Sequence, residues 1–194
     1  MKKVNFFFIT RTIGAFFMVS WMLGCEKSPD VTKVENVTKT TEVTIGSTDI
    51  GSALDMVGPD FINADKWQAT SSMVATKMYV YVANQVEGKK IKCAIYSDGT
   101  DGPATLLGET NERTNPGTGW QKFTLSTSVS IVYGTYYWLA MWTDGEFLVK
   151  TEISEGTCWF APSKYASGWP SLMSSGSTGT YVHSLYASGT TGTH

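Results

Sequence analysis

Two neighbouring segments decide the fold: Trp120-Gln-Lys-Phe-Thr-Leu125 and, after a polar connector, Gly134-Thr-Tyr-Tyr-Trp-Leu-Ala-Met-Trp-Thr-Asp144. Successive side chains of a strand point to opposite faces. In the second segment one face carries Tyr137, Leu139 and Met141, and the other carries Tyr136, Trp138, Ala140 and Trp142. Because both faces are apolar, the pattern predicts a central strand that is covered on both sides. We expect Trp120 and Trp138 to be buried.

The segments around this pair show the same two-residue period. Met78, Val80 and Val82 alternate with Tyr79 and Tyr81, and Ile91, Cys93 and Ile95 repeat the pattern. Further short strands are expected at 104–109, 146–152, 158–160 and 181–188, with turn clusters between them. No segment has a helical period. The sequence therefore predicts an all-β domain over residues 45–190, a two-sheet antiparallel β-sandwich of jelly-roll-like type.

The charge of the chain argues against one class of partner. The 194 residues include 15 Lys and Arg against 17 Asp and Glu, which gives a net charge of −2. The basic residues are scattered, whereas nucleic-acid binding needs a clustered basic surface that neutralises phosphates. We therefore expect no nucleic-acid partner.

The first 24 residues are typical of an export signal. Lys2, Lys3 and Arg11 supply positive charge, and an apolar run that is too short for a stable membrane span ends in Met22-Leu-Gly-Cys25. This end resembles the lipobox of bacterial lipoproteins, in which the Cys is lipidated and becomes the mature N-terminus. The resemblance implies a lipoprotein signal peptide over 1–24 and a lipid on Cys25 that anchors the protein to the outer membrane or cell surface. An ordinary cleaved signal peptide is the alternative.

Residues 25–44 have the composition of a flexible tether. From Ser28 onward the segment consists mainly of Thr, Val, Lys and Glu, and it has no large apolar side chain to offset the entropy of ordering. The last part, Thr41 to Ile45, could instead join the sheet as an edge strand. Either arrangement holds the folded domain away from the membrane.

Two cysteines, Cys93 and Cys158, follow Cys25 in the chain. Cys93 shares a strand face with Ile91 and Ile95, so we expect it to point into the core. An exported protein permits a disulfide between Cys93 and Cys158, and two separate buried thiols are the alternative. No paired Cys/His spacing indicates a zinc site.

Groups suited to catalysis are scarce. His183 lies in the last expected strand, where a structural role is the usual one, and His194 is the other histidine. No Ser lies in a nucleophile-elbow motif. Asp98 and Asp101 offer oxygen ligands of the kind that Ca²⁺ prefers, but Asp-Gly pairs are also ordinary turn chemistry. We expect no enzymatic activity, no cofactor and no metal.

Aromatic side chains make up 13% of the chain, more than a core of this size must bury. Rings with an apolar face and a polar edge suit surfaces that stack on sugars. Packing in the core is the alternative for each of them. The rings favoured for ligand binding are Trp142, Trp159, Tyr165 and Trp169, the last two in a long Gly/Ser-rich loop over 164–179.

Four blocks of the chain resemble a family of β-sandwich modules in secreted and cell-surface proteins of bacteria and archaea. As they stand here, the blocks are Ile91-Lys-Cys-Ala-Ile-Tyr-Ser-Asp98, Gly102-Pro-Ala-Thr-Leu-Leu-Gly108, Gly119-Trp-Gln-Lys-Phe-Thr-Leu125 and Gly134-Thr-Tyr-Tyr-Trp-Leu-Ala140. The resemblance implies a non-catalytic module that binds glycans or other surfaces. It transfers no catalytic residue to this chain.

Three functional hypotheses follow from these patterns. The first is a lipid-anchored, non-catalytic surface module that binds carbohydrate, either a glycan or another component of the envelope surface. The second is a structural or protein-interaction lipoprotein of the envelope, which contacts its partner through a sheet edge or an apolar face. An unrecognised hydrolase that uses His183 is the third.

Overall fold

The computed structural model describes residues 40–173 and 176–191. They belong to the second of two units of the chain, Thr38–His194. The expected signal peptide, the expected lipidation site Cys25 and most of the expected tether lie outside the described residues. No helix among the described residues is long and apolar enough to cross a membrane.

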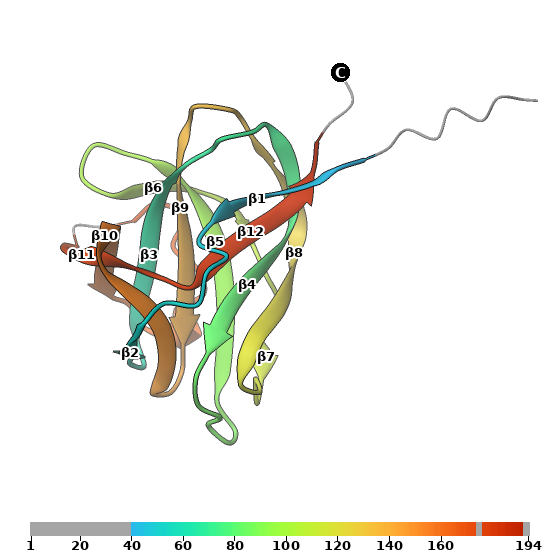
Figure 1. Ribbon diagram of the computed structural model, residues 1–194. Helices are drawn as coiled ribbons and strands as arrows, with labels where there is room; N and C mark the ends of the chain where they lie inside the picture. The colour runs from blue at the N-terminus through green and yellow to red at the C-terminus, as the bar shows by residue number, and fades with distance from the viewer. Residues whose placement is uncertain (1–39, 174–175, 192–194) are drawn as a thin grey trace, which may run out of the picture. The chain divides into compact units, whose positions relative to one another are not determined.

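The strands form one hydrogen-bonded antiparallel network, in which a single β10–β4 pair, Val149 with Val82, joins two sheets (Figure 1). The first sheet contains β1 (Glu42–Gly46), β12 (Leu185–Thr190), β4 (Met73–Val82) and β8 (Gly119–Ile131), in that order. The second contains β6 (Pro103–Glu109), β5 (Lys90–Asp98), β9 (Tyr136–Thr143), β3 (Phe61–Gln68), β10 (Phe147–Pro162) and β11 (Ser177–His183). Two short strands complete it: β2 (Ala53–Val57) pairs with the start of β10, and β7 (Arg113–Thr114) pairs with the start of β5.

The two sheets meet where the chain passes from one to the other. β11 pairs with β10 of the second sheet up to His183, and β12 pairs with β4 of the first sheet from Leu185 onward. Ser184 lies between them, and its backbone N–H donates to the carbonyl of Lys150. A single pair, Val149 with Val82, also links β10 to β4. The predicted all-β, jelly-roll-like sandwich is thus confirmed.

The main core fills the space between the sheets. Its buried side chains include Met78 and Val80 from β4, Phe123 from β8, and Leu139 and Met141 from β9. Burial of this much apolar surface is the dominant favourable contribution to folding. Cys93 points into this core, as its strand parity predicts.

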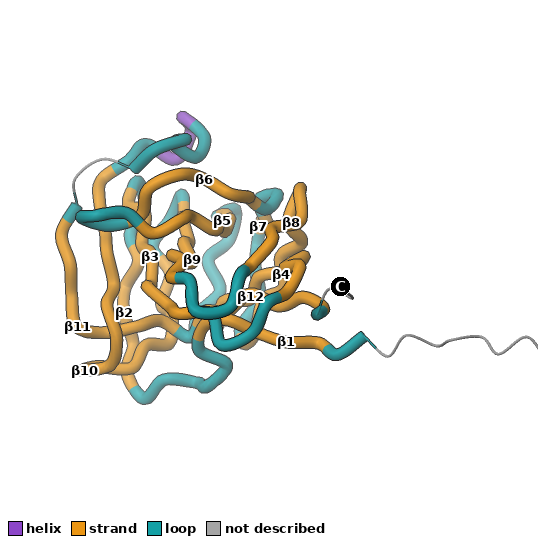
Figure 2. The backbone as a smooth tube through the Cα atoms, turned by 90° about the horizontal axis from the view of Figure 1, so that it is seen from above, coloured by secondary structure: helices purple, strands orange, loops and turns teal. Residues whose placement is uncertain are grey.

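A second apolar cluster covers the opposite face of the second sheet. Trp138, Ala140 and Trp142 of β9 lie there, and the loop over 163–173 packs against them. Figure 2 shows the short helix η1 (Tyr165–Ser167) of this loop on the outside of the strands. β9 therefore lies between two strands and has both faces covered, so its prediction as a central strand is confirmed.

Several elements differ from the sequence-based expectation. The segments 146–152 and 158–160 form one strand, β10, whose register shifts between Ile153 and Cys158, instead of two strands. β1 begins at Glu42 and pairs with β12, so of the two alternatives for Thr41 to Ile45 the edge strand is the correct one. Trp138 is buried as expected, but Trp120 is only half-buried on the outer face of the first sheet, so that expectation was wrong.

Candidate functional site

Two of the four favoured aromatic rings are inaccessible. Trp142 is 0% exposed and Trp159 is 1% exposed. Both project from the second sheet into the cluster beneath the 163–173 loop, because their strand parity places them on its outer face. As exposed stacking platforms, Trp142 and Trp159 were therefore wrongly predicted. Tyr165 and Trp169 of the loop are half-buried and pack on the same cluster.

Three of the four rings come together around one ammonium group. Nζ of Lys92 lies 4.3 Å from the ring centre of Trp142, 4.2 Å from that of Tyr165 and 5.5 Å from that of Trp169. The Trp142 ring contacts the other two, with centroids 5.4 Å and 5.2 Å away. A desolvated cation over aromatic faces is stabilised by about 2 kcal/mol. Lys92, which the sequence did not mark as a site residue, is thus the centre of the aromatic arrangement.

The loop that supplies Tyr165 and Trp169 is held by hydrogen bonds to its backbone. The N–H of Tyr165 donates to Oδ1 of Asp60, and the N–H of Ser163 donates to the carbonyl of Asp60, both at 2.8 Å. At the other end of the loop, the hydroxyl of Tyr96 donates to the carbonyl of Pro170 at 2.7 Å. The loop is therefore fixed to the sheet at both ends.

A pocket of about 550 Å³ opens beside Lys92, and we call it the Lys92 pocket. Its lining residues are Asp60, Lys90, Lys92, Glu112, Asp144, Tyr165, Ala166 and Gly168. Its volume falls within the range of about 300–1,000 Å³ that is usual for small-molecule sites. The sequence identified one of its lining residues, Tyr165, as a binding candidate.

Charged groups in the pocket hold one another in place. Nζ of Lys90 donates to Oε1 of Glu112 at 2.5 Å, and this bond lowers the pKa of the Glu112 carboxyl. The hydroxyl of Tyr165 contacts the other oxygen of Glu112 at 3.4 Å. Burial lowers the pKa of Lys92 from its ordinary value. The pocket therefore presents fixed donors and acceptors beside an aromatic ring.

A second group of rings lies on the outer face of the first sheet, and we call it the open row. It consists of Tyr186 on β12, Tyr79 and Tyr81 on β4, and Trp120 on β8, all half-buried. Tyr79 and Tyr186 stack with centroids 4.5 Å apart, and Trp120 meets Tyr186 edge-on at 5.0 Å. The alternation of Tyr79 and Tyr81 with Met78 and Val80 was the signal that could have identified this face.

The two cysteines do not form a disulfide. Cys93 and Cys158 are both free and buried. They lie on β5 and β10, which are separated in the sheet by β9 and β3. Three strand spacings amount to roughly 14 Å, whereas bridged cysteines need Cα atoms within about 7 Å. The disulfide alternative is therefore wrong, and the alternative of two separate thiols is correct.

His183 takes part in a buried polar cluster. Its Nδ1 lies 2.9 Å from Oδ1 of Asp65, and its Nε2 lies 3.1 Å from Oδ2 of Asp55. Burial alone would lower the pKa of His183, but the two carboxylates outweigh it and raise this pKa well above the ordinary value. Cys158, whose thiol pKa is raised by burial, lies in the same cluster. A buried thiol with a raised pKa is a poor nucleophile, so the cluster does not favour nucleophilic catalysis.

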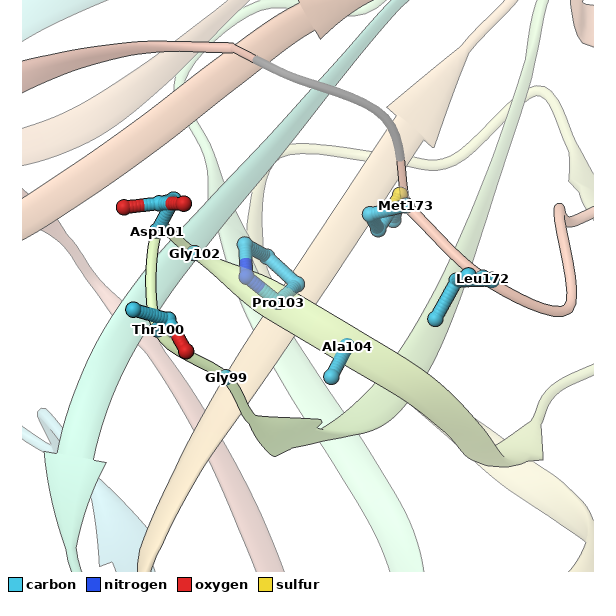
Figure 3. Close-up of a pocket in the computed structure, with 8 residues that line it drawn as sticks. All are labelled: Gly99, Thr100, Asp101, Gly102, Pro103, Ala104, Leu172 and Met173. Atoms are coloured by element: carbon cyan, nitrogen blue, oxygen red, sulfur yellow. The ribbon is translucent and has the colours of Figure 1, made fainter.

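The turn that carries Asp98 and Asp101 also forms a pocket wall. Figure 3 shows Gly99 to Ala104 facing Leu172 and Met173 across a pocket of about 270 Å³, with the side chain of Asp101 directed away from those two residues. Asp98 accepts a hydrogen bond from Nε1 of Trp138 at 2.7 Å and pairs with Nζ of Lys66 at 2.8 Å. Its carboxylate thus has two protein partners, which gives the calcium alternative no support.

Comparisons with known proteins identify no family for this chain. No protein-family model matches the sequence, and no curated protein matches it. Two solved structures of infectious bursal disease virus are similar to the chain. For the Gx strain the identity is 15% and the TM-score 0.34 over 80% of this chain, and for the Gt strain they are 14% and 0.32 over 79%. This chain spans 37% and 42% of the length of those two viral chains.

Proposed function

We propose that this protein is a lipid-anchored, non-catalytic module of the cell envelope that binds a neutral glycan in the Lys92 pocket. The observation that carries the proposal is the composition of this pocket, in which the ring of Tyr165 lies beside three carboxylates and two ammonium groups. The lipid on Cys25 and the resemblance to cell-surface modules are supported by sequence patterns alone, and both are part of the proposal.

The chemistry of the pocket suits a polyol. Each sugar hydroxyl is both a donor and an acceptor, as any hydroxyl is. Carboxylates of Asp60, Glu112 and Asp144 can accept hydrogen bonds, while the ammonium groups of Lys90 and Lys92 can donate. Carboxylates outnumber ammonium groups by one, so the pocket repels an anionic ligand. A neutral sugar is therefore favoured over a uronic or sialic acid.

The pocket can be tested by glycan-array binding and calorimetry with the full chain. Glu112→Gln and Tyr165→Ala are expected to weaken binding of a neutral oligosaccharide at least about tenfold, which corresponds to roughly 1.4 kcal/mol. Trp120→Ala in the open row is the matched control, and it is expected to bind as the unaltered chain does. Loss of binding in the control alone would place the ligand on the open row. Absence of binding to every glycan would end the proposal.

The anchor is tested separately. Cys25→Ala is expected to release the protein from the membrane fraction of the cells that produce it, because the acyl chains supply the binding energy. Continued sedimentation of this variant with membranes would contradict the lipid anchor but leave the pocket untouched.

An apolar patch favours a second candidate function, contact with another envelope protein. Leu54 is 53% exposed and Met56 62% exposed on β2, and Leu148 lies opposite Met56 on β10. Among the described strands β2 pairs with β10 alone, so its other edge is open. Exposed edges with apolar side chains are typical association sites. Cross-linking in intact envelopes is expected to trap a partner that is lost in Met56→Lys and retained in Glu112→Gln.

A further inference from the structure

Three strands bring together side chains that are far apart in the sequence and that bind metals elsewhere in proteins. Asp65 lies on β3, directly opposite Cys158 on β10, and His183 ends β11 on the far side of β10. Their ligand atoms, a carboxylate oxygen, Sγ and a ring nitrogen, all lie within 4.8 Å of one another. Each of these three residues is 0% exposed.

We propose that Asp65, Cys158 and His183 bind one Zn²⁺ ion as three of its four tetrahedral ligands, a stabilising role that is separate from glycan binding. Zn²⁺ in proteins is held by thiolate, imidazole and carboxylate ligands at about 2.0–2.3 Å, so the ligands of one ion lie within a few ångströms of each other. Thiolate and imidazole ligands together select Zn²⁺ over the harder ions Mg²⁺ and Ca²⁺.

Asp55 supplies the outer contact that such a site requires. Its carboxylate lies 3.1 Å from Nε2 of His183, on the side of the ring away from Asp65. Metal-bound imidazoles almost always donate the N–H of the second nitrogen to a carboxylate or carbonyl, which fixes the ring orientation. With Nε2–H directed at Asp55, Nδ1 is the nitrogen that faces the Asp65 oxygen and the ion.

Charge balance supports the exchange of protons for a metal ion. An Asp65 carboxylate, a His183 imidazolium and a Cys158 thiol together carry no net charge. When Zn²⁺ replaces the Nδ1 proton and the thiol proton, the carboxylate, neutral imidazole, thiolate and ion again sum to zero. The buried cluster therefore gains no net charge on binding, which avoids the large desolvation penalty of an isolated buried ion.

A neighbouring pocket offers a metal ion a path from solvent to the buried cluster. A pocket of about 290 Å³ is lined by Asp55, Asn63, Phe160 and Tyr181 among others, so the carboxylate of Asp55 connects solvent with the buried imidazole. The ring of Tyr181 lies edge-on to His183, with centroids 5.5 Å apart. Sequence spacing gave no hint of this site because its ligands come from three separate strands.

Cobalt substitution tests the site directly. The full chain is unfolded in denaturant together with a chelator, which is then removed. It is refolded with one equivalent of Co²⁺ or Zn²⁺, and its metal content and absorption spectrum are measured. We expect one metal ion per chain and a thiolate-to-cobalt charge-transfer band. Cys158→Ser is expected to lose the band. Cys93→Ser, which alters the other buried thiol, is the matched control and is expected to keep it.

Thermal unfolding gives a readout that does not depend on a variant folding. At a free Zn²⁺ concentration of about 100 times Kd, the unaltered chain is expected to melt roughly 5–10 °C higher than with chelator. A chain that retains no metal after refolding, or a band that survives Cys158→Ser but disappears in Cys93→Ser, would overturn the proposal. Glycan binding by such a metal-free chain would leave the proposed function intact.

Discussion

The aromatic rings on the outer faces of the two sheets differ in what covers them. On the second sheet, Trp138, Trp142 and Trp159 lie beneath the 163–173 loop and are almost completely buried. On the first sheet, the open row is half-exposed and lies on the outer face of β12, β4 and β8. Both sets arise from the same strand alternation. A ring on an outer face is therefore a core residue or a surface residue according to whether a distant segment folds over it.

The largest contrast is expected from deleting one ring in each set. Trp142→Ala is expected to lower the free energy of unfolding by about 3–5 kcal/mol, because it leaves a cavity under the loop. Trp120→Ala is expected to lower it by about 1–3 kcal/mol, because its contacts with Tyr81 and Tyr186 contribute about 0.5–1.5 kcal/mol each. Urea unfolding of both variants measures the difference. Equal losses would show that the open row is also part of the core.

Packing around Trp159 offers a second comparison. A Cβ at Gly102, where φ is +148°, would lie 2.7 Å from Nε1 of Trp159, whereas a Cβ at Gly119, with φ of +86°, would meet nothing within 4 Å. Gly102→Ala is expected to destabilise the domain by about 1–3 kcal/mol through overpacking as well as backbone strain. Gly119→Ala has the strain alone, so the difference between their melting temperatures isolates the clash.

The buried hydroxyl of Tyr96, beneath the 163–173 loop, is expected to make the stability of the domain depend on pH in the alkaline range. Burial raises the pKa of Tyr96 above its ordinary value of 10.0. Because the unfolded chain loses this proton first, the contribution of Tyr96 to stability is complete below pH 10.0 and declines as pH rises toward the folded-state pKa. Tyr96→Phe is expected to flatten this decline above pH 10.0, as measured by urea unfolding at a series of pH values. The substitution also removes the hydrogen bond to Pro170, which is expected to lower the free energy of unfolding by about 1 kcal/mol. A decline of unchanged slope would contradict a buried phenol.

The smallest expected effect is spectroscopic. Acrylamide is expected to quench the fluorescence of Trp120 but hardly that of Trp142 or Trp159, which lie at 0% and 1% exposure. Single Trp→Phe substitutions identify each contribution. Strong quenching that disappears in Trp142→Phe would show that the loop opens over the second sheet.

Local patterns predicted the strands well because the alternation of a strand depends only on residues that are neighbours in the sequence. The two apolar faces of Tyr136 to Thr143 identified β9 as the central strand, and the parity of Cys93 placed it in the core. The continuity of β10 was missed because its two halves are separated by a polar, Gly-containing stretch that resembles a turn.

The site was predicted less well because it depends on contacts between distant segments. Nothing near Trp142 in the sequence reveals that Tyr165 and Trp169 cover it, or that Lys92 lies among the three rings. Likewise, the meeting of Asp65, Cys158 and His183 follows from the order of β3, β10 and β11, which no spacing rule records. Exposure was therefore wrongly expected for Trp142 and Trp159, whereas Tyr165 lines the Lys92 pocket.

The pairing of β1 with β12 brings the two ends of the domain together, which suits the domain to circular permutation. The N–H of Thr191 donates to the carbonyl of Thr41 at 3.2 Å, so the two ends of the folded domain are hydrogen-bonded to each other. A linker of a few residues can join them, and new termini can be opened in the exposed turn at Gly88 between β4 and β5. Domains with adjacent ends usually tolerate such circular permutation. The same adjacency allows the sandwich to be inserted into a surface loop of a host protein without forcing that loop apart.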